Sequence, residues 1–137
     1  MEISGPPIVP DERSAEFFAA AAEDRLVIRH CRNCAHLLGL EARTCSWCGS
    51  GDLEWWRASG AGQLVTWSVV HHPPHPAFAA EVPFPIGMVE LVEGPWLTVR
   101  LAGVPLSALR IGLPMRAAFV HPAEGDSYPV FVPEGEL

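Results

Sequence analysis

The four cysteines of this chain lie within one stretch of eighteen residues, as two Cys-x-x-Cys pairs. The pairs are Cys31/Cys34 and Cys45/Cys48, with ten residues between them. Each pair can close a tight turn that directs two thiolates at one centre, and Zn²⁺ takes four such ligands in a tetrahedron at about 2.3 Å. A complete set of four cysteines leaves no open coordination position. The spacing therefore predicts a zinc ribbon with a structural metal, and iron in the same cage is the alternative.

Disulfide bonds are the other use of four cysteines. No secretory leader precedes the motif, so we expect a reducing, cytoplasmic compartment in which disulfides are rare. His30 and His36 flank the first pair and could replace a cysteine as ligand, but four cysteines already complete the set.

The charge of the chain limits its partners. Nine basic residues, all of them arginine, face sixteen acidic ones, for a net charge of −7. The absence of lysine excludes Schiff-base chemistry and the lysine of a Walker phosphate loop. An acidic chain without a basic run is a poor match for a phosphate backbone, and no uninterrupted apolar run reaches the about 18 residues of a membrane span. We expect neither nucleic acid nor membrane as a partner.

An amphipathic helix is predicted near the N-terminus, from Asp11 or Ser14 to about Asp24. An extended arm precedes it, because three prolines fall in the first ten residues. Phe17 and Phe18 belong to the apolar stripe of this helix. They either pack on the ribbon or are presented to a ligand or partner subunit.

The rest of the chain predicts short strands joined by turns. Two short strands are expected around the cysteines, and after a turn marked by Gly60 and Gly62 five longer ones follow. A hairpin turn at Gly94-Pro95 and a helical turn at Leu106–Leu109 separate some of them. The expected strands are Leu26–Ile28, Leu53–Ala58, Leu64–His71, Phe84–Val92, Trp96–Leu101, Met115–His121 and Tyr128–Val132.

This inventory predicts a mainly β fold. Five strands with one helical turn favour a small closed barrel of the OB-fold kind, and a small open sandwich is the alternative. We expect an arm and helix over residues 1–24, a zinc ribbon over residues 25–58 and a barrel over residues 59–137.

Candidates for chemistry outside the cysteines are weak. His71, His72 and His75 share the run H-H-P-P-H-P, but its prolines splay neighbouring side chains apart and no carboxylate completes a metal site. The run is better suited to contact with a partner. No nucleophile and base come together in the sequence, and Glu90 and Glu93 are expected to face solvent on a strand rather than act as acid and base. The residues describe a scaffold or binding module and not a catalyst.

The order of these features resembles a family long catalogued as a domain of unknown function, DUF thirty-five. An amphipathic helix, the two cysteine pairs and S-G-A-G before a strand ending in V-V-H occur in the family's order. One departure is Glu41-Ala42-Arg43-Thr44, where members usually show a proline before the arginine. Three later segments agree: P-F-P-I-G-M-V-E-L-V-E-G-P at Pro83–Pro95, L-R-I-G-L-P-M at Leu109–Met115 and Y-P-V-F-V-P at Tyr128–Pro133.

The resemblance implies a rubredoxin-like zinc ribbon joined to an OB-fold barrel of five strands. It also implies a non-catalytic companion of a thiolase-like or lipid-transfer-protein-like enzyme, an aldolase or thiolase that acts on acyl-CoA, including steroid side chains. Some members are fused to a hydratase domain, so this chain could be a piece of such a fusion. If CoA contacts the chain, its phosphates would meet Arg29, Arg32, Arg43 or Arg57, and ion pairs with acids are the alternative for each arginine.

Two other function classes remain open from the residues. A ribbon joined to an OB-fold can bind nucleic acid, although the net charge of −7 argues against this. A four-cysteine cage can also carry iron and one electron, as in rubredoxin.

Overall fold

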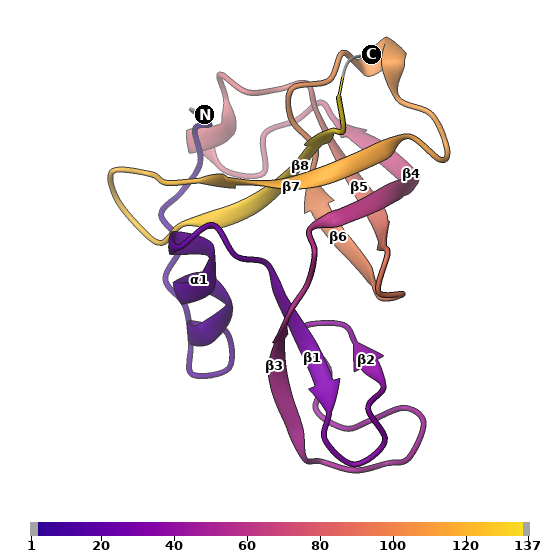
Figure 1. Ribbon diagram of the computed structural model, residues 1–137. Helices are drawn as coiled ribbons and strands as arrows, with labels where there is room; N and C mark the ends of the chain where they lie inside the picture. The colour runs from indigo at the N-terminus through magenta and orange to yellow at the C-terminus, as the bar shows by residue number, and fades with distance from the viewer. Residues whose placement is uncertain (1–2, 136–137) are drawn as a thin grey trace.

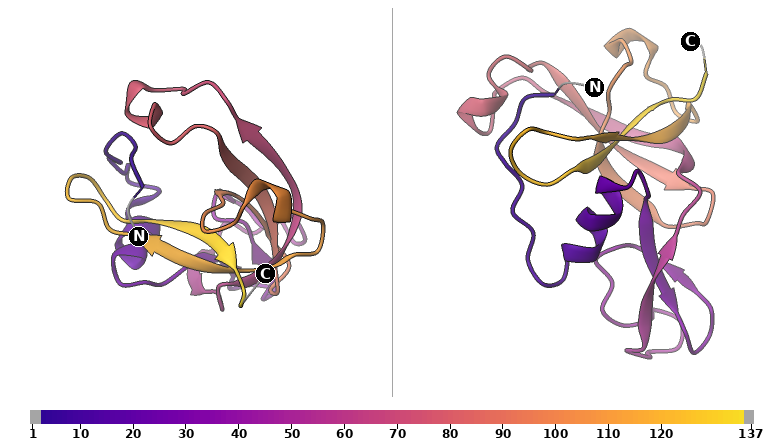
Figure 2. Two further views of the ribbon diagram at one scale, coloured as in Figure 1. Left: turned by 90° about the horizontal axis from the view of Figure 1, so that it is seen from above. Right: turned by 60° about the vertical axis from the view of Figure 1, so that its left-hand side comes forward.

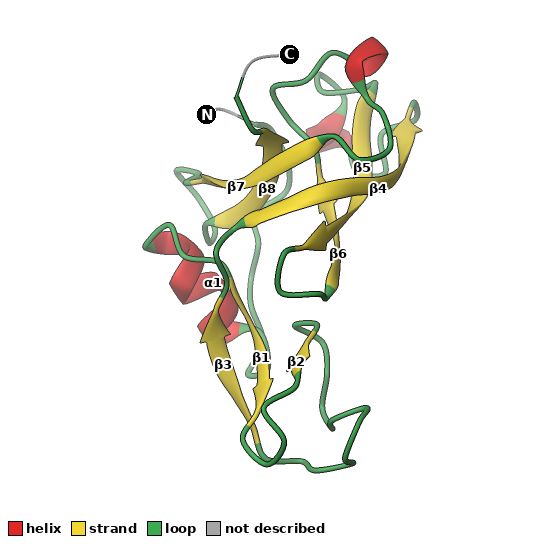
Figure 3. Ribbon diagram, turned by 45° about the vertical axis from the view of Figure 1, so that its right-hand side comes forward, coloured by secondary structure: helices red, strands yellow, loops and turns green. Residues whose placement is uncertain are grey.

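A computed structural model describes residues 3–135 and consists of two β-sheets, one α-helix and two short 3₁₀ helices (Figure 1). In Figures 1 and 3 the smaller sheet projects from one end of the larger one. The elements in chain order are α1 (Ala15–Ala22), β1 (Val27–Cys31), β2 (Leu37–Leu38), β3 (Leu53–Arg57), β4 (Ala61–Val70), η1 (Pro76–Phe78), β5 (Phe84–Leu91), β6 (Trp96–Arg100), η2 (Leu106–Ala108), β7 (Pro114–Val120) and β8 (Tyr128–Pro133).

The small sheet carries the cysteines, and its strand order is β2-β1-β3, with both pairings antiparallel. Its central strand was expected at Leu26–Ile28 but runs over Val27–Cys31, so it ends on the first cysteine. The reason is its pairing with β3, which extends from Val27 opposite Arg57 to Cys31 opposite Leu53. Pairing with a neighbouring strand can extend a strand over polar residues, and a local pattern of apolar residues does not predict that extension.

The large sheet has the strand order β6-β5-β4-β7-β8, in antiparallel pairs. It curls so that its two edges meet: Leu101 forms a parallel bridge with Phe131, whose carbonyl accepts a 2.9 Å hydrogen bond from the Ala102 N–H. A five-stranded, partly open barrel with this order is the OB-fold topology. The predicted fold class is confirmed.

A glycine at the start of the barrel differs from its expected role. Gly60 does turn the chain, with φ of 85°, but Gly62 lies inside β4 opposite Leu91. A Cβ added at Gly62 would stand 2.5 Å from the Glu90 carbonyl oxygen. Gly62 is therefore required by close packing between strands and not by a turn, and β4 begins at Ala61, three residues before the expected strand.

Helix α1 is shorter than expected because its C-terminal end closes early. The Arg25 N–H donates to the Ala20 carbonyl and the Asp24 N–H to the Ala21 carbonyl, at 2.9 and 3.0 Å. Asp24 takes a left-handed conformation with φ of 59°. This is the Schellman termination, in which an αL residue satisfies the last carbonyls of a helix.

One apolar core joins the helix, the base of the small sheet and the barrel. Phe17 of α1, Ile28 of β1 and Leu64 and Phe131 of the barrel belong to a single buried cluster. The cysteine end of the small sheet has its own minor cluster, made of Cys31, Leu38 and Cys45 with partly buried neighbours. So small a cluster cannot hold the cysteine turns by apolar burial alone.

The arm over residues 3–10 is extended and runs beside the β7–β8 connection (Figure 2). The Ile8 carbonyl accepts a 3.1 Å hydrogen bond from the Asp126 N–H. The division of the chain at residues 24 and 58 stays a prediction. No helix within residues 3–135 has the length and apolarity that crossing a bilayer would require.

Candidate metal centre and adjoining cavity

The two cysteine turns have the same backbone pattern. In the first, the Cys31 carbonyl accepts from the Ala35 N–H at 2.8 Å and the Cys31 N–H donates to the His36 carbonyl at 2.9 Å. In the second, Cys45 makes the equivalent bonds with Gly49 and Ser50, at 2.9 and 2.8 Å. Each turn therefore directs its two sulfurs to the same side.

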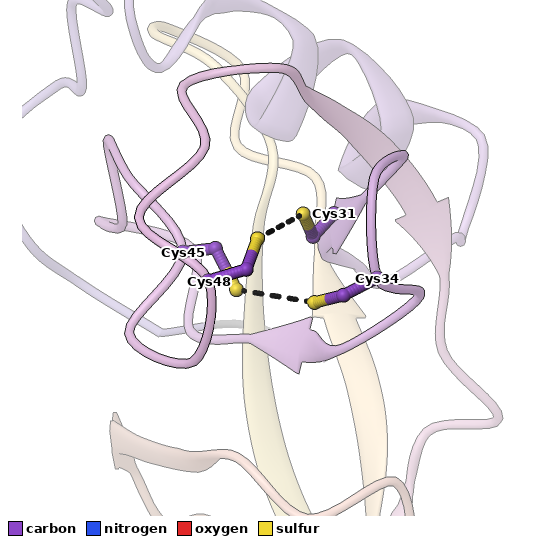
Figure 4. Close-up of side chains that lie close together, drawn as sticks. All are labelled: Cys31, Cys34, Cys45 and Cys48. Atoms are coloured by element: carbon purple, nitrogen blue, oxygen red, sulfur yellow. Dashed lines mark hydrogen bonds between the residues drawn. The ribbon is translucent and has the colours of Figure 1, made fainter.

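The four sulfurs converge on one point between the turns (Figure 4). The Sγ atoms of Cys31 and Cys48 are 3.6 Å apart, those of Cys34 and Cys45 are 3.5 Å apart, and all four lie within 4.8 Å of one another. Four ligands at about 2.3 Å from one ion stand about 3.8 Å from each other in a tetrahedron. The cysteines are free thiols at the spacing of a metal cage, and they could bind one metal ion.

The pKa values of two of the thiols are shifted in opposite directions, which reflects how close the four sulfurs are. The Asn33 side-chain amide and the Ser50 N–H lower the pKa of Cys48 to about 6. At Cys34 the His36 N–H acts to lower the pKa, but burial and the neighbouring sulfurs outweigh it and raise the pKa to about 12. Four sulfurs this close cannot all be thiolates without a positive charge among them, and a divalent metal supplies that charge.

Aromatic and charged side chains surround the cage. His36 stacks on Trp47 with ring centroids 3.9 Å apart, although Trp47 is 76% exposed. On the neighbouring strands His30 stacks on Trp56 at 4.4 Å, and its Nδ1 lies 2.7 Å from the Glu54 carboxylate. These contacts orient the turns from outside the ligand set.

A cavity of about 560 Å³ opens beside the cage, between the start of α1 and the small sheet. Arg29 projects into it and stacks over the Trp55 ring at 4.3 Å, and its Nε is buried without a hydrogen-bond partner. Arg43 and Phe17 also line the cavity. A half-buried guanidinium, with one nitrogen bonded to the Leu53 carbonyl at 3.4 Å and its Nε donor unpartnered, is suited to an anionic or carbonyl-bearing ligand.

The residues expected to contact a partner do not form one group. Arg29, Arg43 and Phe17 meet at the cavity, but Phe17 is only 7% exposed and packs mainly in the core. Phe18 also packs against the core. Arg32 points elsewhere and lies 3.6 Å from the Glu54 carboxylate, as the ion-pair alternative expected.

The histidine loop lies apart from this site. His71, His72 and His75 are exposed in the β4–β5 connection, and the His75 side chain caps η1 by accepting a 3.0 Å hydrogen bond from the Ala77 N–H. Within residues 3–135, they belong to no cluster that could hold a metal ion. Glu90 and Glu93 also have structural partners: Glu90 bonds Gln63 and Trp96, and the Glu93 carboxylate accepts from the Ser59 N–H at 2.7 Å.

The sequence reasoning missed one arrangement. His121 lies 2.7 Å from the Asp24 carboxylate through Nε2 and 2.7 Å from the Ser127 hydroxyl through Nδ1. The sequence offered no argument for a serine, a histidine and an aspartate lying together. Asp24 and His121 are 97 positions apart, so no local signal pairs them. All three are at the surface or half-buried, and they tie the end of α1 to the β7–β8 connection.

The barrel and a larger part of the chain resemble known proteins. Residues 55–120 match the family model described as ChsH2, C-terminal OB-fold domain. Over 120 residues the chain is 38% identical to the "Probable enoyl-CoA hydratase alpha subunit" of Thermomonospora curvata, covering 88% of this chain and 37% of that protein. Over 89 residues it is 35% identical to a "DUF35 domain-containing scaffold protein" of Pyrococcus furiosus, covering 65% of this chain and 64% of that protein.

Solved structures extend the likeness to nearly the whole chain. A chain of the structure described as "Ltp2-ChsH2(DUF35) aldolase" is 38% identical, with a TM-score of 0.79, and the match covers 94% of this chain and 98% of that one. A DUF35 protein from Sulfolobus solfataricus shares the fold at 12% identity, with a TM-score of 0.59. The sequence order, the cysteine cage, the barrel and these matches agree, and the chain belongs to the DUF35 family.

Proposed function

We propose that this protein is a non-catalytic accessory subunit that binds and organises a partner enzyme. The observation that carries the proposal is the 38% identity, over 94% of this chain, to a chain of an aldolase described as Ltp2 with ChsH2(DUF35). The scaffold-protein name of the Pyrococcus furiosus relative supports the same role. The cysteine cage also supports it, because four sulfur ligands leave no open position for a substrate.

The partner in this proposal is a thiolase-superfamily enzyme, a lipid-transfer-protein-like aldolase or a thiolase, that acts on acyl-CoA. Steroid side chains are the substrate class that the family resemblance suggests. The hydratase name of the Thermomonospora curvata relative supports an acyl-CoA context. This chain spans only 37% of that relative. The proposed assembly therefore also includes a hydratase domain.

The proposed acyl-CoA contact is the cavity beside the cage. Arg29 and Arg43 offer guanidinium groups to phosphates, and Trp55 offers a flat ring already stacked on Arg29. The cavity opens at the surface between α1 and the small sheet. At this surface the chain would cover the entrance to the partner's active site. Arg32 and the histidine loop could add contacts with the partner outside this cavity.

The proposed metal is Zn²⁺, held by Cys31, Cys34, Cys45 and Cys48. When bound it supplies folding energy to the two turns and no chemistry. The sulfur spacing and the absence of any disulfide among the four cysteines support it, and a reducing cytoplasm is the compartment that keeps such thiols free. The proposed zinc ribbon spans residues 25–58, and the proposed barrel spans residues 59–137.

Co-expression with the native thiolase-like enzyme tests the proposal. The partner should copurify with this chain and lose solubility or activity when the chain is omitted. The Arg29→Gln/Arg43→Gln variant should keep the complex but raise the KM for acyl-CoA by about tenfold. Arg110→Gln, which removes an arginine that does not line the cavity, is the matched control. Full partner activity in the absence of this chain would overturn the accessory role.

A further inference from the structure

The arginines of this acidic chain fall into two groups. Within residues 3–135, three of the nine form ion pairs with acids within 4.0 Å: Arg25, Arg32 and Arg100. The other six arginines have no acidic oxygen at that distance in the part of the chain that the structure describes. Five of these six line three hollows beside α1 and β3, whereas the sixth lines none of the three. The five are Arg13, Arg29, Arg43, Arg57 and Arg116, and the sixth is Arg110.

The three hollows follow one another in a row, and each shares lining residues with the next. The cavity of about 560 Å³ shares Trp55 with a hollow of about 260 Å³, which in turn shares Arg25 and Arg57 with one of about 310 Å³. We call the part lined by Trp55, Arg57 and Arg116 the β3 groove. It follows the α1-facing side of the small sheet as far as the start of the barrel.

The groove lies along an unpaired strand edge. In the described sheet, β3 has β1 on one side and no strand on the other. The Ala58 N–H donates to the Leu26 carbonyl at 2.9 Å, and the Arg32 N–H donates to the Asp52 carbonyl at 3.0 Å. Because antiparallel bonding alternates along a strand, the backbone groups of Trp55 point away from β1. Those of Arg57 do the same.

Side chains at this edge differ between the two faces of the sheet. Trp55 and Arg57 face the groove, whereas Trp56 faces the other way, 44% exposed. The two smaller hollows, which Arg57 lines, are also lined by acids, but none of these lies within 4.0 Å of Arg57 or Arg116; they are Glu16, Asp24 and Glu134. The edge therefore presents free backbone groups, uncompensated cations on one face and an exposed indole on the other.

An added strand would satisfy all three features. Successive side chains of an extended peptide point to opposite faces, so alternate residues would meet Arg57 and Trp56. Carboxylates suit the first face and apolar groups the second, while the main chain bonds to the β3 edge. A compact small molecule could pair with the arginines but would leave the backbone edge unpaired.

We propose that the β3 groove binds an extended segment of a partner protein, in which acidic and apolar residues alternate, as a fourth strand beside β3. The inference deepens the proposed scaffold function, on which it rests for the existence of a partner, by naming the docking surface and the chemistry of the segment that docks there.

Peptide binding to the full chain tests this inference. The probe is a fluorescein-labelled Glu-Val-Glu-Val-Glu-Val peptide, followed by fluorescence anisotropy. The Arg57→Gln/Arg116→Gln variant should bind it about tenfold more weakly, because two charge-assisted contacts are lost. Arg110→Gln should bind as the unaltered chain does. A peptide with N-methyl groups on alternate amides should also lose about tenfold, because it cannot pair with the strand edge.

Other outcomes would overturn the inference. These are no binding up to about 1 mM peptide, equal binding of a Lys-Val peptide, or equal loss in the Arg110→Gln variant. Displacement by tripolyphosphate together with full affinity of the N-methylated peptide would indicate an anion site instead of strand addition. Because no partner enzyme is present, this assay can fail while copurification succeeds, and the reverse also holds.

Discussion

Ala35 and Gly49 occupy equivalent positions in the two cysteine turns. Each donates its N–H to the carbonyl of the first cysteine of its turn, at 2.8 and 2.9 Å, and each has a positive φ, of 67° and 77°. Glycine adopts this conformation without strain, whereas alanine pays a steric penalty of about 1–2 kcal/mol. The first turn therefore contains a strained residue that the second avoids.

We expect Ala35→Gly to raise the free energy of unfolding by up to about 1 kcal/mol, because relief of strain exceeds the added flexibility of the unfolded chain. Gly49→Ala should lower it by about 1–2 kcal/mol. A Cβ at Gly49 would meet no atom within 4 Å, so only the backbone conformation is tested. Urea unfolding of the metal-loaded chain measures both changes.

Gly51→Ala is the matched control for these variants, because Gly51 has equal space around it and no positive φ. Its midpoint should be unchanged or slightly higher. An equal loss in Gly51→Ala and Gly49→Ala would contradict the assignment of strain to the αL position.

Gly62→Ala should destabilise the barrel. The added methyl would stand 2.5 Å from the Glu90 carbonyl oxygen and 2.7 Å from a Val89 methyl, and the backbone at Glu90 cannot move without disturbing the β4–β5 pairing. Overpacking of this kind costs about 1–3 kcal/mol. Thermal unfolding should show a lower midpoint than the unaltered chain and Gly51→Ala. An unchanged midpoint would mean that β4 and β5 lie further apart than described.

Alkaline pH should weaken the fold through one residue. Burial raises the pKa of Tyr128 above its ordinary 10.0, and the Glu81 carboxylate adds to the rise while Arg100 opposes it. A group with a raised folded pKa keeps its stabilising effect below the unfolded value and loses it as pH increases through the folded one. The free energy of unfolding should therefore decline above pH 10.0.

The composition leaves few other groups that titrate in this pH range. The chain has one tyrosine and no lysine, and metal-bound thiolates carry no proton to lose. Tyr128→Phe should flatten the alkaline decline when urea midpoints are compared from about pH 8 to about pH 11. An equal decline in Tyr128→Phe would show that another group causes it.

Metal analysis of the purified chain should find one zinc ion, and the protein should be colourless. Cys45→Ser should lose the metal and the Trp47–His36 stack, whereas Ser46→Ala should keep both. Structural zinc contributes on the order of 10 kcal/mol to folding in small ribbons. Amide exchange should accordingly increase over residues 31–50 of Cys45→Ser and change little in β4 and β5, whose core lies elsewhere. Visible colour from bound iron would contradict the zinc assignment.

Short-range patterns predicted most of the fold. The seven expected strands all exist within a few residues of their predicted bounds, because alternation of apolar residues and glycine–proline turns act locally. The predictions were wrong where contacts between distant segments determine the local structure. Strand β1 continues to Cys31 because β3 pairs with it, and Gly62 serves the contact with Glu90 rather than a turn.

The sequence alone predicted that the four cysteines come together, because the two residues of each Cys-x-x-Cys pair are held together by a turn of only a few bonds, and the structure places their sulfurs within 4.8 Å of one another. The contacts between distant segments emerge only in the folded chain. Arg29 meets Trp55 across two strands, Asp24 meets His121 from 97 positions away, and Arg57 and Arg116 come together where ribbon and barrel join. Such contacts follow from the packing of whole sheets, and no spacing along the chain encodes them.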